Sequence, residues 1–482
     1  MSIFETYSIP NQCLDEVFSG ERNEVKEPYH KIISVFNSLS SEQFERLNDL
    51  IKISFFNQGI TYQVYSEKEK KEHIFPFDPF PRLIQKKEWD QIEKGTIQRS
   101  LALNLFIKDL YNDQKVLKDK IVPAEMILSS KNFRKEMVGF KPPGGIYCHI
   151  NGTDLIKNSD GNNYVLEDNL RSPSGVSYVL SNREALKRTM SDIFQSYAIL
   201  PVWDYPMSLL AMMQSVKPKT SDQPVCVVLT PGMYNSAYYE HMFLAKQMGI
   251  ELVEGHDLVM EDDYVYMKTT DGLIKVDVIY RRIDDDFLDS EVFNKESVLG
   301  VKGLMRSYNR GNVTVVNAPG TGVADDKAVY SYVPKIIKYY LNEDPILNNV
   351  HTYICENPSD LDYVINNLEN LVVKPVDQSG GYGISIGNKL SQQELDECKR
   401  KIKDSPRQFI AQPIMALTTH ATYIDKEGQF SPRHVDLRTY TLIGNDYQYV
   451  LKGGLSRVAL KKGSLIVNSS QGGGSKDTWV LS

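Results

Sequence analysis

Features that would assign a sequence to several broad classes of protein are missing from this 482-residue chain. Its five cysteines are scattered and show no C-x-x-C spacing, which is typical of reduced thiols rather than of a disulfide framework or a zinc site. No apolar run approaches the roughly 20 residues that span a bilayer, and the first residues lack the basic start and apolar core of a signal peptide. The net charge of −7 offers no basic footprint for nucleic acid. We therefore expect a cytoplasmic protein without a nucleic-acid or membrane partner.

The composition is that of a globular protein, and the chain alternates between helical and strand patterns. Hydrophobic residues make up 41% and charged residues 24%, and the length suggests about three domains. Strand, helix and strand follow one another from residue 225, which indicates βαβ units and a parallel sheet. The prolines of PFDPFP (76–81) must break any helix. Helices are expected at 28–39, 41–56, 96–111, 182–197, 235–248 and 325–341, and from Ser391, where Glu394 completes a capping box. Strands are expected at 225–230, 250–255, 276–282, 371–376, 383–387, 409–414, 434–444 and 447–455.

The stretch NGTDLIKNSDGNNYVLEDN predicts a hairpin with acidic groups at opposed positions. With Asp160-Gly161 as a two-residue turn, Asp154 lies opposite Glu167, and Asn169 shares their face while Asp168 points the other way. Opposed like charges destabilise a cross-strand pair, and a divalent cation would remove that conflict. Two carboxylates and an amide oxygen suit Mg²⁺ or Mn²⁺. An isolated hairpin of this kind is nevertheless more often a solvated turn whose acids have no role.

A second motif, LVVKPVDQSGGYGISIG, places Lys374 in an apolar strand that leads into the loop Ser379, Gly380, Gly381, Tyr382 and Gly383. Glycines let backbone N–H groups approach phosphate oxygens, and a nearby lysine neutralises them, although a glycine cluster alone is equally a flexible turn. Other nucleotide motifs fail. There is no G-x-x-x-x-G-K-[ST], and the G-x-G-x-x-G spacing is missed by one residue and leads into a strand. The glycine loop of a protein kinase precedes its lysine, whereas here the lysine comes first.

A strand–Lys–Pro–glycine loop–strand segment, combined with an acid-x-Asn strand, resembles the ATP-grasp superfamily. An ordinary ATP-grasp enzyme carries the acid-x-Asn strand last, whereas here it comes first. The chain therefore resembles the circularly permuted ATP-grasp family (type 2), which is related to glutathionylspermidine synthase. The resemblance runs from about residue 110 to the C-terminus and includes VLEDNLRSPSGVSYVL, YRRIDDDF, GTGVADDKAVYSYVP, VVKPVDQSGGYG and VNSSQGGGSKDTWV.

The resemblance implies a mixed α/β chain with a circularly permuted ATP-grasp fold. Residues 1–130 would form a mostly helical N-terminal region, and residues 131–200 the permuted metal-ligand hairpin and helix of the ATP-grasp core. Residues 201–320 would form a Rossmann-like pre-ATP-grasp domain that supplies part of the substrate site. Residues 321–482 would form the ATP-grasp nucleotide-binding subdomains. These borders are soft by several residues.

The resemblance also implies residue roles. Asp154, Glu167 and Asn169 would be the Mg²⁺ ligands, in agreement with the hairpin argument. Lys327 and Lys374 would be the lysines that contact the ATP phosphates, and residues 379–383 the loop over the β- and γ-phosphates. Gln412, in the hinge strand FIAQPI, would lie next to adenine. For Lys327 the alternative is a solvated helix lysine.

Two arginines complete the implied site. Arg438, in HVDLRTYTLIG, would act on the phosphate side, and Arg457 would be a second such residue, since guanidinium groups bind carboxylate and phosphate with two donors. For Arg457 a structural ion pair is an equally good interpretation. The triplet 284–286 and the preceding arginines are placed near the substrate cleft, although local ion pairs would explain them equally well. Three histidines at no metal spacing are interpreted as hydrogen-bonded strand or loop residues: His149, His420 and His434.

The implied activity is that of an ATP-dependent carboxylate–amine ligase that acts through an acylphosphate. Its substrates would be a small-molecule or peptide carboxylate and an amine, and homo-oligomerisation is left open. Two alternatives use the same ATP-binding fold: a phosphotransferase acting on a hydroxyl or a protein histidine, and a non-catalytic ATP-binding protein. The full set of metal ligands and both lysines argue against the second.

Overall fold

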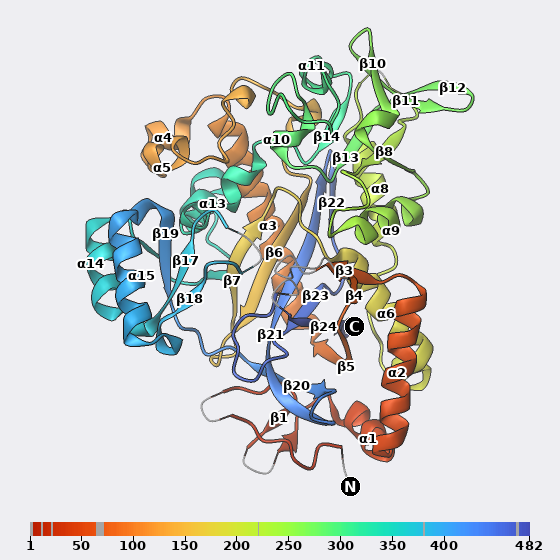
Figure 1. Ribbon diagram of the computed structural model, residues 1–482, viewed down its shortest axis with the longest axis vertical. Coiled ribbons are helices and arrows are strands. Elements are labelled where there is room, and N and C mark those ends of the chain that lie inside the picture. Colours follow the sequence, from red (N-terminus) through yellow and green to blue (C-terminus); the bar gives the residue numbers. More distant parts are fainter. Residues whose placement is uncertain are drawn as a thin grey trace.

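The computed structural model describes residues 3–10, 13–20, 23–63, 72–219, 221–378, 381–468 and 472–482. Within these residues, nine strands form a twisted sheet through the middle of the molecule (Figure 1). Neighbouring strands are antiparallel except at the two edges, where β15 runs parallel to β7 and β5 runs parallel to β24. The order along the sheet is β15 (Asn348–Asn349), β7 (Asn163–Asn169), β6 (Ile150–Lys157), β21 (Gln429–Gly444), β23 (Leu455–Val458), β24 (Gly474–Val480) and β5 (Phe77–Ile84). The long strand β21 also pairs with β20 (Thr419–Ile424) near its start and with β22 (Tyr447–Val450) near its end.

The hairpin of β6 and β7 confirms the expected opposition of Asp154 and Glu167, although the expected turn is wrong. Its tip holds three residues, 159–161, rather than two, and Gly161 adopts φ 81°, as the last residue of a three-residue hairpin loop does. One extra residue in β7, Leu166, then forms a bulge that shifts the register by one. The extra loop residue and the bulge cancel each other, so the two acids still face one another.

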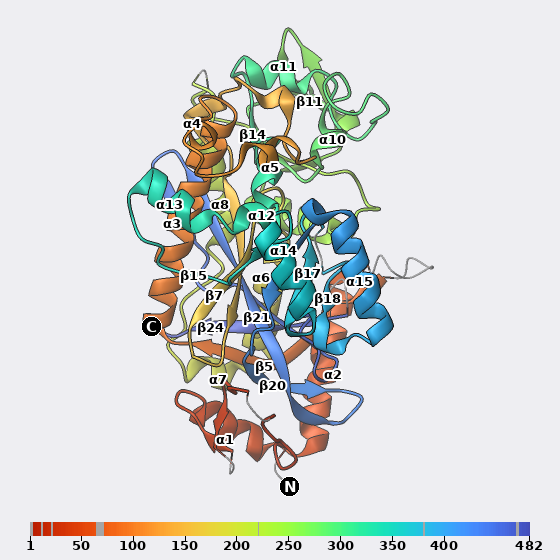
Figure 2. The same ribbon diagram turned by 90° about the vertical axis from the view of Figure 1, so that its left-hand side faces the viewer.

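A second sheet stands beside the central one and carries helices on its outer side (Figures 1 and 2). Its antiparallel order is β16 (Tyr353–Ile354), β19 (Phe409–Pro413), β17 (Leu371–Pro375) and β18 (Ser385–Ile386), and its helices are α14 (Pro358–Asn367) and α15 (Gln392–Asp404). The capping box of Ser391 and Glu394 at the start of α15 is confirmed. The expected helix at 325–341 is instead divided into η4 (Thr321–Asp325), α12 (Lys327–Tyr330) and α13 (Val333–Leu341). Pro334 has no N–H to continue a helix, so α13 begins anew around it.

The expected βαβ region forms a parallel, Rossmann-like sheet in the order β14 (Thr314–Val316), β13 (Val278–Arg281), β8 (Cys226–Leu229) and β9 (Glu251–Val253). Helices α8 (Tyr205–Ser215) and α9 (Tyr238–Met248) pack together against this sheet. Gly249 ends α9 with φ 67°, as its position after the last apolar residue predicts. An antiparallel sheet of β10 (Leu258–Glu261), β11 (Tyr264–Thr269) and β12 (Gly272–Val276) projects from this region in Figure 1.

The N-terminal part of the chain supplies helices and one strand of the central sheet. Helices α1 (His30–Ser38) and α2 (Ser41–Asn57) lie where periodicity places them, and α3 (Lys86–Leu110) begins ten residues before the expected start. The PFDPFP segment does break the helical pattern, and it forms most of β5 at the sheet edge, where prolines are tolerated because one side needs no N–H. The helix expected at 182–197 starts earlier, as α6 (Val176–Thr189), and is interrupted before α7 (Ser191–Gln195).

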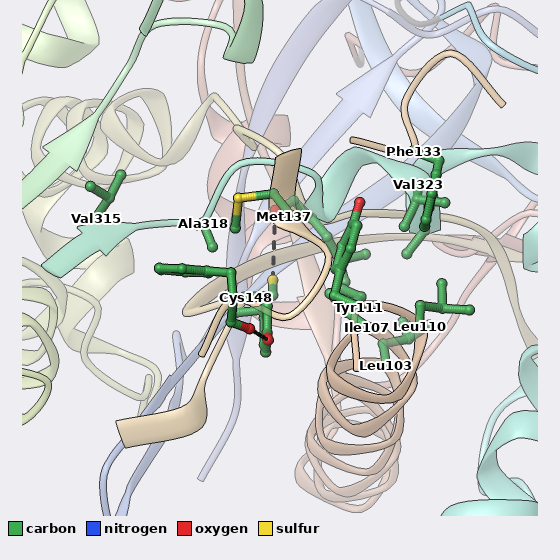
Figure 3. Close-up of a cluster of buried hydrophobic side chains, with 14 of the residues drawn as sticks. Leu103, Ile107, Leu110, Tyr111, Phe133, Met137, Cys148, Val315, Ala318 and Val323 are labelled. Atoms are coloured by element: carbon green, nitrogen blue, oxygen red, sulfur yellow. Dashed lines mark hydrogen bonds between the residues drawn. The ribbon is translucent and has the colours of Figure 1, made fainter. Parts of the chain in front are cut away.

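One large core connects α3 to the Rossmann-like sheet and to the segment before β6 (Figure 3). It joins buried side chains from α3, β14 and η4 and from the segments 111–148 and 317–320: Leu103, Ile107, Leu110, Tyr111, Phe133, Met137, Cys148, Val315, Ala318 and Val323. This packing fixes the start of β6 beside the Rossmann-like sheet. The five cysteines are free, as their spacing predicts. No helix among the described residues has the length and apolar character needed to cross a membrane.

Candidate functional site

A pocket between the central sheet and the β16–β19 sheet collects most of the residues predicted from the sequence. The predicted residues that line it are Asp154, Glu167, Lys327, Lys374, Gly381, Tyr382, Gln412 and Arg457. Arg438 lies at its edge, bonded to Asp154. Asn169 and Gly383 are not part of the pocket wall. Ser379 and Gly380 lie outside the described residues.

Asp154 is the centre of a buried cluster of charges on three neighbouring strands. The register pairs Arg438 of β21 with Asp154 of β6, and Asp436 of β21 with Arg457 of β23. Arg438 donates to both carboxylate oxygens of Asp154, from Nε at 2.6 Å and from Nη2 at 2.7 Å. Arg457 donates from Nη2 to Asp154 at 2.7 Å and from Nε to Asp436 at 2.8 Å. Burial opposes ionisation, but the two guanidinium groups outweigh it and hold the pKa of Asp154 well below its ordinary value.

This cluster shows that Arg457 fits both interpretations left open by the sequence. Its side chain is only 6% exposed and is fixed by two carboxylates, as a structural ion pair would be. It also lines the pocket. Its charge is therefore held in a set position at the pocket wall.

Glu167 lies in a more open place than Asp154 and meets two cations at longer range. Lys327 Nζ is 3.4 Å from one carboxylate oxygen of Glu167, and Arg438 Nη2 is 3.7 Å from the other. Lys327 also donates to the carbonyl of Gln378 at 2.6 Å. The repulsion between Glu167 and Asp154 is thus relieved by side chains of the protein itself. That repulsion is therefore not evidence for a metal ion.

Asn169 is fixed by the sheet: its Nδ2 donates to the carbonyl of Gly152 at 3.1 Å. Across the part of the chain that the structure describes, no group of three or more His, Cys, Asp or Glu side chains is arranged to hold a metal ion.

Lys374 lies on the opposite wall, on β17, beside Gln412 of β19. Its Nζ donates to Gln412 Oε1 at 2.7 Å, and Gln412 Nε2 donates to Thr352 Oγ1 at 2.9 Å. Burial lowers the pKa of Lys374 to about 8, the nearby Lys327 adds to this effect, and Glu167 opposes it. Both polar atoms of the Gln412 amide therefore have protein partners, and Lys374 is a half-buried lysine whose pKa is lowered to about 8.

The described part of the glycine loop has a conformation that needs glycine. Gly381 and Gly383 adopt φ values of 79° and 70°, in the left-handed region that side chains disfavour. A Cβ at Gly383 would lie 2.7 Å from Pro375, so backbone and ring approach too closely for any other residue. Tyr382, between the glycines, faces the pocket and is 37% exposed.

The apolar walls of the pocket were not predicted from the sequence. Ile156 and Leu166 lie on the hairpin side, Val372 and Ile386 lie on the facing sheet, and the segment 465–468 between β23 and β24 covers the same space. These residues look like ordinary strand residues in the sequence, and only the approach of the two sheets brings them together. Apolar surfaces that face each other with polar groups at one end are typical of a small-molecule site.

The three histidines singled out above are all away from this pocket. His149 is fully buried, and burial lowers its pKa to about 3. His420 contacts the hydroxyl of Tyr29 at 3.0 Å, and His434 lies 3.1 Å from the carbonyl of Leu417. His420 and His434 are hydrogen-bonded as expected. The expected hydrogen bond is wrong for His149, because neither of its buried ring nitrogens has a partner among the described residues.

Comparisons with known proteins agree with the arrangement of the sheets. The family model described as "Circularly permuted ATP-grasp type 2" matches residues 81–459, and so begins ahead of the limit near residue 110 that the motifs gave. An uncharacterized protein of Synechocystis sp. is 50% identical over 474 residues, covering 98% of each chain. An uncharacterized protein of Mycobacterium tuberculosis is 46% identical over 478 residues, covering 99% of this chain and 86% of that protein.

Two further matches are more distant or partial. A Frankia alni protein provisionally named as a glutamate–cysteine ligase is 38% identical over 469 residues, which cover 97% of this chain and only 53% of that protein. Among solved structures, a glutathione synthetase-like effector from Globodera pallida in its apo form has a TM-score of 0.61 at 10% identity. It covers 92% of this chain and 98% of that one, which shows a shared fold.

Asp168 is predicted to lie on the face of the hairpin opposite Asp154 and Glu167. In the structure it forms a buried ion pair. Arg99 Nη2 lies 2.5 Å from its carboxylate, both side chains are 1% exposed, and Thr153 Oγ1 donates to it at 3.1 Å. We predict that Asp168→Asn lowers the free energy of unfolding by about 3 kcal/mol, because the arginine charge stays buried without its partner. Urea denaturation measures this loss.

The control for that measurement is Asp344→Asn, which removes a carboxylate that is 89% exposed and pairs with Lys338 at the surface. Exposed pairs contribute little to stability. A loss for Asp168→Asn no greater than that of the control would contradict the prediction.

Proposed function

Because this chain belongs to the circularly permuted ATP-grasp type 2 family, we propose that it is an ATP-dependent ligase that joins a carboxylate to an amine. The observation that carries the proposal is the pocket between the two sheets, which combines apolar walls with a surplus of positive charge. With Lys374 protonated, four cationic side chains face three carboxylates, a net charge of 4 − 3 = +1. The cations are Lys327, Lys374, Arg438 and Arg457, and the carboxylates are Asp154, Glu167 and Asp436.

The proposed ATP pose follows from the two halves of the pocket. The apolar walls suit the faces of a purine ring, and the cations suit the triphosphate. Lys327 and Lys374 approach the same space from α12 and β17 and carry charge to the phosphates. The left-handed glycines 381 and 383 allow backbone N–H groups to come close to phosphate oxygens. Since Lys374 and Thr352 already bind the Gln412 amide, we assign adenine recognition to the strand backbone rather than to that side chain.

The donor set on β6 and β7 fits Mg²⁺ in its chemistry, since carboxylate and amide oxygens are the ligands that this ion accepts. Glu167, 21% exposed, is the more accessible acid, and Asn169 lies two residues away on the same face. Asp154 would bind a metal only by exchanging one of its arginine contacts. When bound, Mg²⁺ would neutralise phosphate charge; Glu167 and Asn169 are the residues we assign to hold it.

In the proposed reaction the γ-phosphoryl group of ATP passes to the substrate carboxylate, which yields an acylphosphate and ADP. The amine nitrogen then attacks the acyl carbon, the C–O bond to phosphate breaks, and phosphate leaves with the bonding electrons. The nitrogen releases a proton to solvent, and an amide remains. Arg438 and Arg457 stabilise the charge on the transferred group from fixed positions, because Asp154 and Asp436 orient their guanidinium planes.

We predict that the protein forms an acylphosphate that can be trapped. With ATP, Mg²⁺, hydroxylamine and a panel of amino acids, dicarboxylates and short peptides, at least one carboxylate should give a hydroxamate together with equal amounts of ADP and phosphate. A phosphorylated product without free phosphate would indicate a phosphotransferase instead. Binding of ATP without ADP release for every carboxylate would contradict the ligase proposal.

We predict that ATP binding takes up a proton at high pH through Lys374. Burial lowers the pKa of this lysine to about 8, and phosphate charge favours its protonated form. At pH 7 the lysine is already charged, whereas at pH 9 ATP binding should take up close to one proton, and affinity should fall as pH rises from 8 to 9. Calorimetry in buffers of different ionisation enthalpy measures the uptake. The same uptake in Lys374→Met would show that another group is responsible.

We predict that Glu167→Gln lowers turnover by about 10²-fold or more and weakens Mn²⁺ binding in the presence of ATP, because the amide keeps the shape and loses the charge. Mn²⁺ electron paramagnetic resonance measures the binding. The control is Asp160→Asn at the exposed tip of the same hairpin, which should behave as the wild type. Unchanged Mn²⁺ affinity in Glu167→Gln would remove this residue from the metal site.

A further inference from the structure

A second pocket, here called the loop pocket, lies at the carboxyl ends of β8 and β13, where ligands bind in open α/β sheets. It has a volume of about 270 Å³, which suits a small molecule. Its walls come from the loop after β7, the start of α9 and the segment after β13. The residues that the argument uses are Ser172, Ser174, Arg282, Asp284, Phe287 and Leu299.

The loop after β7 is held rigidly from the Rossmann-like side. The Glu240 carboxylate accepts hydrogen bonds from the backbone N–H of Gly175 at 2.7 Å and of Ser177 at 3.1 Å. Its other oxygen accepts from Arg282 at 2.9 Å, and Arg282 also donates to Ser174 Oγ at 2.5 Å. Arg282 and Glu240 are almost completely buried, at 2% and 1% exposure. The pocket wall is therefore preformed.

The same loop connects the loop pocket to the charge cluster of the nucleotide site. The carbonyl of Ser174 accepts from Arg438 at 3.5 Å and from Tyr440 Oη at 2.9 Å. Ser174 therefore contacts Arg438 through its carbonyl and Arg282 through its hydroxyl. A molecule in this pocket lies beside the place where the proposed acylphosphate forms.

The accessible charge of the loop pocket is negative. Glu240 neutralises Arg282, and burial lowers the pKa of His241 to about 2, so this histidine is uncharged. Asp284 is 56% exposed, and its nearest cation, the half-buried Arg171, lies 3.7 Å away, beyond hydrogen-bond distance. Asp284 is the one carboxylate among the described residues that line the pocket.

The three aspartates of the 284–286 triplet have different surroundings. Asp285 is 3% exposed and pairs with Arg281 at 2.7 Å, and Asp286 pairs with Arg134 at 2.8 Å outside the pocket. Only Asp284 faces the pocket. Nearby, the Ser172 hydroxyl has no hydrogen-bond partner among the described residues, while Phe287 and Leu299 present partly exposed apolar surface.

We propose that the loop pocket binds the amine substrate in its ammonium form, with Asp284 as the carboxylate that meets the cation and Ser172 as a hydrogen-bonding partner. The ammonium group releases one proton to solvent before its nitrogen attacks the acyl carbon, and the second proton leaves as the amide forms. Phe287 and Leu299 contact the carbon chain of the amine. The proposal rests on the ligase function above and assigns the acceptor class to this pocket. Asp284 selects a positively charged primary amine over an uncharged nucleophile of similar size.

The test compares a charged and an uncharged nucleophile in two matched variants, with the carboxylate that gives most hydroxamate. The probes are 1,3-diaminopropane, which is cationic near neutral pH, and hydroxylamine, which is not. Asp284→Asn should raise the ratio of KM for the diamine to KM for hydroxylamine about tenfold, the size of effect that a close charge pair exerts on binding. Asp286→Asn removes an equally exposed neighbour, 57% against 56%, and should keep the wild-type ratio. Ser172→Ala should raise the ratio by a smaller factor.

The possible results distinguish a failure of the loop-pocket proposal from a failure of the ligase function. An equal ratio in both aspartate variants would overturn the proposal, and so would a wild-type protein that forms hydroxamate but shows no saturable ADP release with the diamine. A wild-type protein that forms no hydroxamate with any carboxylate would instead refute the ligase function on which the proposal rests. Circular dichroism of both variants establishes that the comparison is made between folded proteins.

Discussion

The carboxylate of Asp154, shared between Arg438 and Arg457, is the contact on which the site depends. It joins three neighbouring strands, β6, β21 and β23, whose residues lie far apart in the sequence. Burying these charges is costly, so they are stable only while each keeps its partners. The cluster therefore ties the register of the sheet to the positions of the arginines. A slip by one residue in any of the three strands would turn these side chains to the other face and leave charges unpaired.

The same electrostatics explain why the opposite wall of the pocket carries lysines. The carboxylates on β6 and β7 attract positive charge across the gap, which opposes the loss of charge that burial imposes on Lys374. Lys327 and Lys374 repel one another, so a site with both lysines charged favours an anion between them. In the proposed complex, the triphosphate of ATP would neutralise the lysines and leave the arginine cluster intact.

Local patterns predicted the parts of this protein whose causes are local. The capping box at Ser391, the end of α9 at Gly249 and the facing acids of the hairpin all follow from short-range rules. The hairpin register was right although its turn was wrong, because the bulge at Leu166 compensated for a longer loop. Long-range contacts could not be foreseen: the Arg99 partner of Asp168 is 69 residues away, and that of Asp154 is 284 residues away. The apolar walls escaped notice for the same reason, since ordinary strand residues form a pocket only when two sheets meet.

One short segment, from Glu167 to Gly175, passes through both pockets. Its first residue, Glu167, lines the pocket between the two sheets, and its last residues are held by hydrogen bonds to Glu240 and Arg282 of the Rossmann-like region. A reaction between two substrates requires their reacting atoms to be held a few ångströms apart in a fixed orientation. In the proposed reaction that orientation would not depend on a separate moving part, because the strand that carries the acids continues directly into the loop that lines the second pocket. Arg438 contacts both ends of this segment, Asp154's neighbour Glu167 on one side and the Ser174 carbonyl on the other. In the proposed reaction, its guanidinium group would therefore lie beside both the leaving phosphate and the incoming amine.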